Sequence, residues 1–270
     1  MSLLLGNLKP PPGRARIAVA LLYGFVCHSV FAAAVLSMII VMFFGMTIGL
    51  GTLTAPWNWV ANAILILQFP LAHSFLLSSR GRRLLSRTAP RAYGGTLSTT
   101  TYAIIASFQL IALFILWSPS GVVWWRAEGA MFPVICTLYA IAWLLLVKAS
   151  YDAGAEVQSG ALGWMSMLQK IKPNYPPMPT SGLFAIIRQP IYLSFALTLW
   201  TVPVWTPDQL MVAVSLTAYC LIGPLLKERR FVELFGDRFE RYKKQTPYMV
   251  PRVRQLTGDN SRVRRNSVSD

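Results

Sequence analysis

The residues best suited to chemistry lie in the last third of the chain. Glu228 stands among cations in Lys227-Glu228-Arg229-Arg230, directly after an apolar run, and Arg188-Gln189-Pro190-Ile191-Tyr192 stands where another apolar run begins. A carboxylate at the edge of an apolar segment marks a candidate site, because ionisable groups are costly to place there. The same block could also be a solvated charge cluster that closes a helix. A guanidinium such as that of Arg188 can hold a carboxylate through two parallel hydrogen bonds.

An aromatic stripe with helical spacing follows the charged block. Its members are Phe231, Phe235, Phe239 and Tyr242. Gly236 interrupts the pattern, and Asp237 with Glu240 three residues later resembles a capping box that starts a new short helix. The helix-break-helix could fold back over the mouth of a helix bundle, or it could lie on a lipid surface.

The elements that position these residues are predicted to be membrane helices. Apolar residues make up 54% of the 270 residues and charged residues 13%, against roughly 25% charged in soluble domains. Lys and Arg number 25 against 10 Asp and Glu, for a net charge of +15. These cations fall in short blocks between apolar runs, which is typical of membrane-protein loops and argues against a nucleic-acid partner.

Six apolar runs are candidates to span the bilayer, since about 20 helical residues cross its hydrocarbon layer. They cover residues 17–49, 59–78, 100–117, 130–148, 186–204 and 210–226. A short turn joins the last two, and either Thr206 or Asp208 can cap the helix that follows it. Basic connections alternate with nearly neutral ones, which predicts that both termini face the cytoplasm.

The predicted fold is therefore all-α: a polytopic membrane helix bundle of about six transmembrane helices with a cytoplasmic C-terminal helical segment. Residues 1–254 form one domain, and residues 255–270 form a disordered basic tail. The long cytoplasmic linker at 151–180 has room for a short amphipathic piece around 162–168. A bacterial inner membrane is the expected location.

The sequence shows no phosphate-binding loop, dinucleotide fingerprint or metal-ligand cluster, so no metal site is predicted. The three cysteines stand singly in apolar runs, which predicts buried thiols; they are Cys27, Cys136 and Cys220. His28 and His73 each lie inside a predicted span. They could ligate a haem, or they could form hydrogen bonds between helices.

The C-terminal motifs resemble those of the isoprenylcysteine carboxyl methyltransferase superfamily of integral membrane methyltransferases. The similarity runs from Arg188-Gln189-Pro190-x-Tyr192 through Glu228-Arg229 to Phe235-Gly236-x-x-Phe239-x-x-Tyr242 and closes at Pro247 to Pro251. Weaker similarity over most of the chain points to the bacterial methanethiol S-methyltransferase branch. It includes His73-Ser74 ahead of the Arg-rich connection.

This resemblance implies that S-adenosylmethionine binds at the cytoplasmic side, between the last two spans and the folded-back C-terminal segment. The residues implied to line its pocket are Arg188, Gln189, Tyr192, Glu228 and Tyr242, with Arg188 and Glu228 also carrying the catalytic roles. Arg188 would hold the cofactor's carboxylate, and Glu228 would bind its amino group or ribose hydroxyls. The implied methyl acceptor is a small, methanethiol-like thiol or a lipid-linked carboxylate that enters from the bilayer or through the bundle, among membrane lipids.

Two residues depart from the superfamily pattern. Gln189 stands in place of a His, and Lys227 stands in place of the first Glu of a Glu-Glu pair. Glutamine keeps hydrogen-bonding capacity without the imidazole charge, and lysine reverses a charge. The site is then either tuned to another acceptor or inactive. The alternatives to an enzyme are a non-catalytic membrane accessory protein on the same scaffold and a transporter, although no internal repeat supports a transporter.

Overall fold

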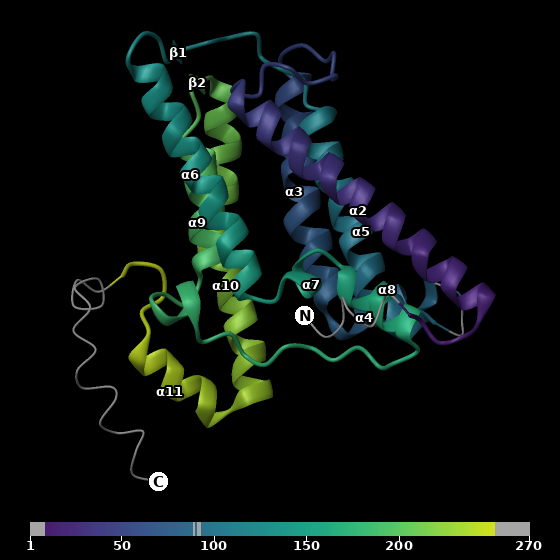
Figure 1. Ribbon diagram of the computed structural model, residues 1–270. Helices are drawn as coiled ribbons and strands as arrows, with labels where there is room; N and C mark the ends of the chain where they lie inside the picture. The colour runs from purple at the N-terminus through teal and green to yellow at the C-terminus, as the bar shows by residue number, and fades with distance from the viewer. Residues whose placement is uncertain (1–8, 89, 91–92, 252–270) are drawn as a thin grey trace.

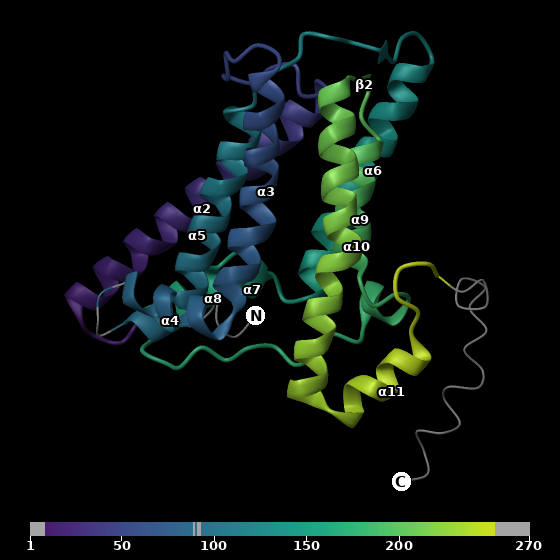
Figure 2. The same ribbon diagram turned by 180° about the vertical axis from the view of Figure 1, so that it is seen from behind.

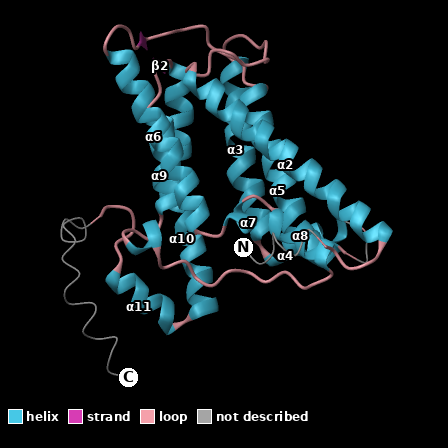
Figure 3. Cartoon of the chain, in the orientation of Figure 1, coloured by secondary structure: helices cyan, strands magenta, loops and turns pink. Residues whose placement is uncertain are grey.

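The computed structural model describes residues 9–88, 90 and 93–251, so the predicted tail at 255–270 lies outside the described residues. Within them nearly all regular structure is helical (Figure 3), and five helices are long and apolar enough to cross a membrane. These helices are α2 (Arg14–Phe43), α3 (Trp57–Leu77), α5 (Gly94–Ile115), α6 (Met131–Asp152) and α10 (Pro207–Phe235). The predicted all-α membrane bundle is confirmed.

The fifth predicted span is much shorter than expected. Instead of 186–204, the helix α9 covers Pro190–Trp200, and a 3₁₀ turn, η1 (Gly182–Ala185), precedes it. At 1.5 Å per residue, eleven helical residues cannot cross a bilayer alone. The predicted span is shortened at both ends. Residues 186–189 do not join the helix, and beyond Trp200 the chain leads into strand β2 (Val204–Trp205), which pairs with β1 (Trp125–Arg126).

The helices form two groups that share one core (Figures 1 and 2). Helices α2 and α5 pack with each other and with α8 (Ala161–Gln169), and α3 packs against α5, while α9 packs between α6 and α10. Near the end that carries β1 and β2, Met42 and Phe114 of the first group join Leu199 and Val212 of the second in one buried cluster. Each such side chain contributes about 1.5–3 kcal/mol of burial energy, so this end holds the two groups together.

Two connecting segments are more ordered than the sequence indicates. The Arg-rich connection forms α4 (Ser79–Thr88), and the linker at 151–180 contains α7 (Ala155–Gln158) as well as α8. The expected amphipathic piece is α8, but residues 161–163 and 165–168 are all buried against α2 and α5. A helix buried on nearly every side packs inside the protein instead of lying on a lipid surface.

Asp208 ties the β1–β2 end together. Thr206 caps α10, since its hydroxyl accepts from the Gln209 backbone N–H at 2.8 Å. Asp208 instead turns to a neighbouring loop: its carboxylate accepts from the Trp117 indole N–H at 2.9 Å and from the Ser120 backbone N–H at 3.0 Å. Asp208 is 1% exposed, so this buried charge is satisfied by neutral donors and by its place in the first turn of a helix.

Replacing Asp208 with alanine is therefore expected to lower the free energy of unfolding by about 2–4 kcal/mol, because buried donors would lose their acceptor. Thermal unfolding in detergent measures the effect. Glu233→Ala, at an exposed position of the same helix, is the matched control and should change stability by less than about 0.5 kcal/mol. Equal stability of the two variants would show that the Asp208 contacts are not needed.

Candidate functional site

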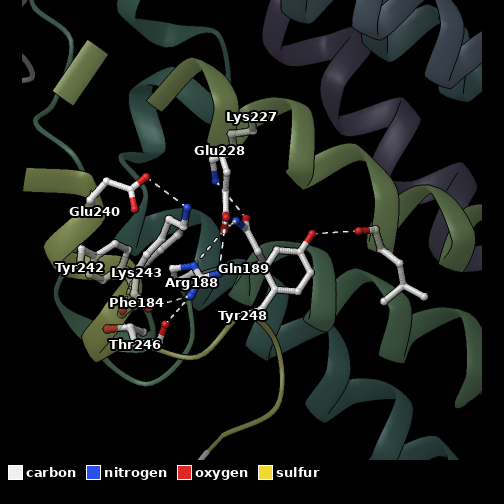
Figure 4. Close-up of polar contacts among 11 residues, drawn as sticks. Phe184, Arg188, Gln189, Lys227, Glu228, Glu240, Tyr242, Lys243, Thr246 and Tyr248 are labelled. Atoms are coloured by element: carbon white, nitrogen blue, oxygen red, sulfur yellow. Dashed lines mark hydrogen bonds and ion pairs between the residues drawn. The ribbon is translucent and has the colours of Figure 1, made fainter. Parts of the chain in front are cut away.

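Three segments that are far apart in sequence meet at the end of the bundle opposite β1 and β2 (Figure 1), and Figure 4 shows the side chains there. They are the turn before α9, the last turns of α10, and the segment formed by α11 (Asp237–Gln245) and the residues after it. The Arg188 backbone N–H donates to the Pro247 carbonyl at 2.9 Å, and that of Gln189 donates to the Tyr248 carbonyl at 3.1 Å. The C-terminal segment thus folds back onto the start of α9, which is one of the two arrangements the sequence allowed.

The aromatic stripe makes this fold-back possible. Gly236, at φ 49°, ends α10 in a conformation that L side chains rarely adopt, and α11 then turns back. The rings of Phe231 and Phe239 lie 5.6 Å apart across the turn, and Phe239 is buried. The predicted capping box is wrong: α11 has Gly236 as its N-cap, with no side-chain cap, and Asp237 is its first helical residue. Ring packing across the turn takes the place of a cap.

Glu228 is the centre of a hydrogen-bonded network. Its carboxylate accepts from Arg188 Nε at 2.9 Å and from the Gln189 side-chain amide at 2.8 Å. A second guanidinium nitrogen of Arg188 lies 3.4 Å from the other carboxylate oxygen. Glu228 is only 8% exposed, and a charge buried to this extent requires such partners. Two residues predicted for the catalytic roles are therefore in direct contact.

Arg188 also fastens α11 to this network. Its remaining terminal nitrogen donates to the backbone carbonyls of Lys243, at 3.2 Å, and of Thr246. These carbonyls belong to the end of α11, where no intrahelical donors remain. The guanidinium also lies 5.5 Å from the centroid of the Tyr248 ring. One side chain thus joins α9, α10 and α11.

The two departures from the superfamily pattern contact each other. The Lys227 ammonium donates to the Gln189 side-chain oxygen at 3.4 Å, while the amide nitrogen of the same side chain donates to Glu228. Glutamine carries a donor and an acceptor at once, so it can connect a cation to a carboxylate. Lys227 and Gln189 are therefore compatible as a pair.

Tyr192 is one of three aromatic residues near Lys227. The Lys227 ammonium is 5.8 Å from the centroid of the Tyr192 ring, 5.7 Å from that of Phe184 and 5.3 Å from that of Phe231. Tyr192 thus joins the predicted set through Lys227.

Comparison with known proteins assigns the chain to a family. Residues 62–258, most of the chain, match the family described as NnrU protein. The chain belongs to the NnrU family. The matched range contains the positions of Arg188, Gln189, Tyr192, Glu228 and Tyr242, whose roles stay a prediction.

Relatives of this NnrU-family chain include named methyltransferases. It is 28% identical over 204 residues to methanethiol S-methyltransferase of Pseudomonas deceptionensis, covering 75% of this chain and 76% of the relative. It is 27% identical over 238 residues to methanethiol S-methyltransferase 1 of Bradyrhizobium diazoefficiens, covering 86% and 82%. Nurim of Xenopus laevis is 30% identical over 139 residues, 46% of this chain and 47% of that protein. No solved structure matches the chain.

These matches confirm the resemblance expected from the motifs, to membrane proteins like the isoprenylcysteine carboxyl methyltransferases and to their methanethiol branch in particular. Together with the five apolar helices, they identify the NnrU-family chain as an integral membrane protein.

Tyr242 contacts the site through the backbone. Its hydroxyl donates to the Phe184 carbonyl at 2.6 Å, which ties α11 to η1. Burial raises the pKa of Tyr242 to about 12, so the phenol is neutral at physiological pH and acts as a donor. Because an unfolded tyrosine ionises near pH 10, its contribution to stability is complete below about pH 10 and is lost between there and pH 12.

Replacing Tyr242 with phenylalanine should lower the free energy of unfolding by about 1 kcal/mol, since one buried carbonyl loses its donor. Thermal unfolding at neutral pH and at pH 11 measures this, and the difference between the two proteins should shrink at the higher pH. A difference that is the same at both pH values would contradict the assignment of the effect to the phenol proton.

Several residues of the site could not be predicted from their own sequence signals. Phe184 lies in a 3₁₀ turn just before a predicted span, and Thr246 and Tyr248 lie on either side of Pro247, where the C-terminal motif closes. The hydrogen bonds between 188–189 and 247–248 form only because the segment after α11 folds back onto the start of α9. No local sequence pattern encodes that fold-back.

The histidines lie outside this network. His28 accepts a hydrogen bond from the Trp164 indole N–H at 3.1 Å, and the His73 ring bonds to the Tyr102 hydroxyl at 2.6 Å. Both side chains therefore form hydrogen bonds between helices, which is the second of the two roles that the sequence permits. In the described part of the chain, no group of three or more His, Cys, Asp or Glu residues is placed to hold a metal ion.

Proposed function

We propose that this protein transfers a methyl group from S-adenosylmethionine to a small thiol such as methanethiol at the cytoplasmic face of the membrane. The observation that carries the proposal is the buried pair of Arg188 and Glu228, with Gln189 hydrogen-bonded to Glu228 and α11 covering the pair. The relatives named methanethiol S-methyltransferase support the reaction type and the acceptor.

The charges of this network suit the amino-acid end of S-adenosylmethionine. That end carries one ammonium and one carboxylate, and the pair offers one carboxylate and one guanidinium. A zwitterion can therefore exchange the single ion pair for two, with no change in the net charge buried. Arg188 would hold the ligand's carboxylate, and Glu228 and Gln189 would hold its amino group.

When bound, S-adenosylmethionine supplies a methyl group on a positively charged sulfur, which a thiolate can attack. The residues of this chain contribute binding, orientation and shelter from water. Arg188 and Glu228 fix one end of the ligand, and α11 with its aromatic stripe covers the site. Such positioning can provide most of the rate enhancement, because the transfer needs little acid–base assistance.

The orientation in the membrane follows from the cations. Four arginines of α4, Arg80, Arg82, Arg83 and Arg87, lie at the same end of the bundle as the site, and the described chain begins and ends there (Figure 1). Basic residues mark the cytoplasmic side. We infer that both termini are cytoplasmic and that the protein lies in a bacterial inner membrane.

Headspace analysis of dimethyl sulfide tests the proposal. Protein purified in detergent is incubated with S-adenosylmethionine and methanethiol, and we expect product that depends on both. A parallel reaction with a prenylated cysteine that carries a free carboxylate tests a lipid-linked carboxylate as acceptor. If neither acceptor is methylated and the cofactor does not bind, the protein is instead a non-catalytic accessory protein on this scaffold.

A further inference from the structure

Three aromatic rings from three different elements surround the Lys227 ammonium. Phe184 comes from η1, Tyr192 from α9 and Phe231 from α10, and their centroids lie 5.3 to 5.8 Å from the Lys227 nitrogen. One ring beside a lysine is common on protein surfaces. Several rings around one cation form the arrangement that binds methylated ammonium groups. We refer to these three rings as the aromatic cage.

An ammonium is a poor match for this cage. It is compact and strongly hydrated, and it carries three donors that need acceptors. The hydrogen bond it makes to Gln189 is long, at 3.4 Å. A sulfonium has no N–H donors and spreads its charge over carbon substituents, so ring faces alone can satisfy it.

The position of the cage relative to the ion pair is also suitable. Lys227 precedes Glu228 in the chain, and Gln189 bonds to both side chains. The sulfonium of S-adenosylmethionine lies only a few bonds from the ammonium and carboxylate that Arg188 and Glu228 would hold. One ligand can therefore reach the ion pair and the aromatic cage together.

We propose that the aromatic cage binds the sulfonium of the methyl donor and that Lys227 is a tethered cation occupying it in the free protein. This inference rests on the proposed function and adds a specificity-determining residue to it. Donor binding then requires Lys227 to leave the cage. The neutral product, S-adenosylhomocysteine, has no sulfonium to gain from the rings, so Lys227 reduces the preference for donor over product.

The test is the ratio of affinities for S-adenosylmethionine and S-adenosylhomocysteine, measured by calorimetry in detergent. Lys227→Met keeps an unbranched side chain and removes the charge, and it should raise the preference for the donor by about 3- to 30-fold. Adding Phe231→Leu to Lys227→Met should cancel most of this gain. Arg229→Met removes a charge from the neighbouring exposed position and should leave the ratio unchanged.

The outcomes separate the two proposals. An unchanged ratio in Lys227→Met, or a gain that survives Phe231→Leu, would overturn the role of the aromatic cage while donor binding stands. An equal gain in Arg229→Met would assign the effect to net charge and would also overturn it. If folded wild-type protein binds neither ligand, the proposed function fails, and the role of the cage fails with it.

Discussion

Replacing Glu228 with alanine is expected to reduce donor affinity and methyl transfer by at least about 100-fold. The ligand's amino group loses its carboxylate partner, which lowers the affinity, while Arg188 loses its counter-charge in the free protein, which lowers its stability. Breaking a buried ion pair typically costs 3–5 kcal/mol, and each 1.4 kcal/mol is a factor of ten in affinity.

Because the same change can destabilise the protein, affinity has to be measured on folded material at a temperature below its unfolding transition. Glu228→Gln keeps the shape and one acceptor, so it should be more stable than the alanine variant and still bind the donor weakly. Glu233→Ala removes a carboxylate from an exposed position of the same helix and should bind normally. A folded Glu228→Ala protein with wild-type affinity would exclude Glu228 from the site.

Replacing Arg188 with alanine should have the second-largest effect, acting on both stability and binding. The variant loses the ion pair to Glu228 and the two carbonyl contacts that hold the end of α11. We expect the free energy of unfolding to fall by about 3–5 kcal/mol. We also expect α11 to be cut by protease at concentrations that leave the wild type intact.

Arg188→Lys separates charge from geometry. Lysine keeps the positive charge but cannot bond Glu228 and the α11 carbonyls simultaneously, because it lacks the planar fork of the guanidinium. Its stability and donor affinity should therefore lie between those of the wild type and the alanine variant. Arg229→Ala, at the exposed neighbouring position to Glu228, is the charge control. If Arg188→Lys behaved as the wild type in protease resistance and binding, the fork contacts would be irrelevant.

The long helices were predictable because hydropathy and length decide them. Five of the six predicted spans exist, most with ends within a few residues. The exceptions are the C-terminus of α2, at Phe43 instead of 49, the N-terminus of α5, at Gly94 instead of 100, and the C-terminus of α10, at Phe235 instead of 226. The short α9 was not predictable, because the residues on either side of it form tertiary contacts. Residues 188–189 before it bond to 247–248, and strand β2 after it pairs with β1. The helices α4 and α8 were missed or misjudged for similar reasons: the first carries many charges, and the second is buried by contacts with α2 and α5.

The sequence predicts which residues form the site better than it predicts which of them contact each other. Motif similarity singled out Arg188, Gln189 and Glu228, and the structure places these three in one network. The contact between Gln189 and Lys227 has no signal in the sequence, because the two residues are 38 positions apart and come from different elements. The sequence could not indicate that Phe184 belongs to the aromatic cage, because Tyr192 and Phe231 come from other elements.

The claim that S-adenosylmethionine binds between the last two helices of the bundle and α11 is tested most directly by hydrogen–deuterium exchange. The wild-type protein in detergent is compared with and without saturating cofactor. We expect slower exchange in peptides covering 182–190 and 237–248, and unchanged exchange at 118–127 near the opposite end. Unchanged exchange at 182–190 and 237–248 under saturating cofactor, or protection confined to other helices, would contradict this location of the site.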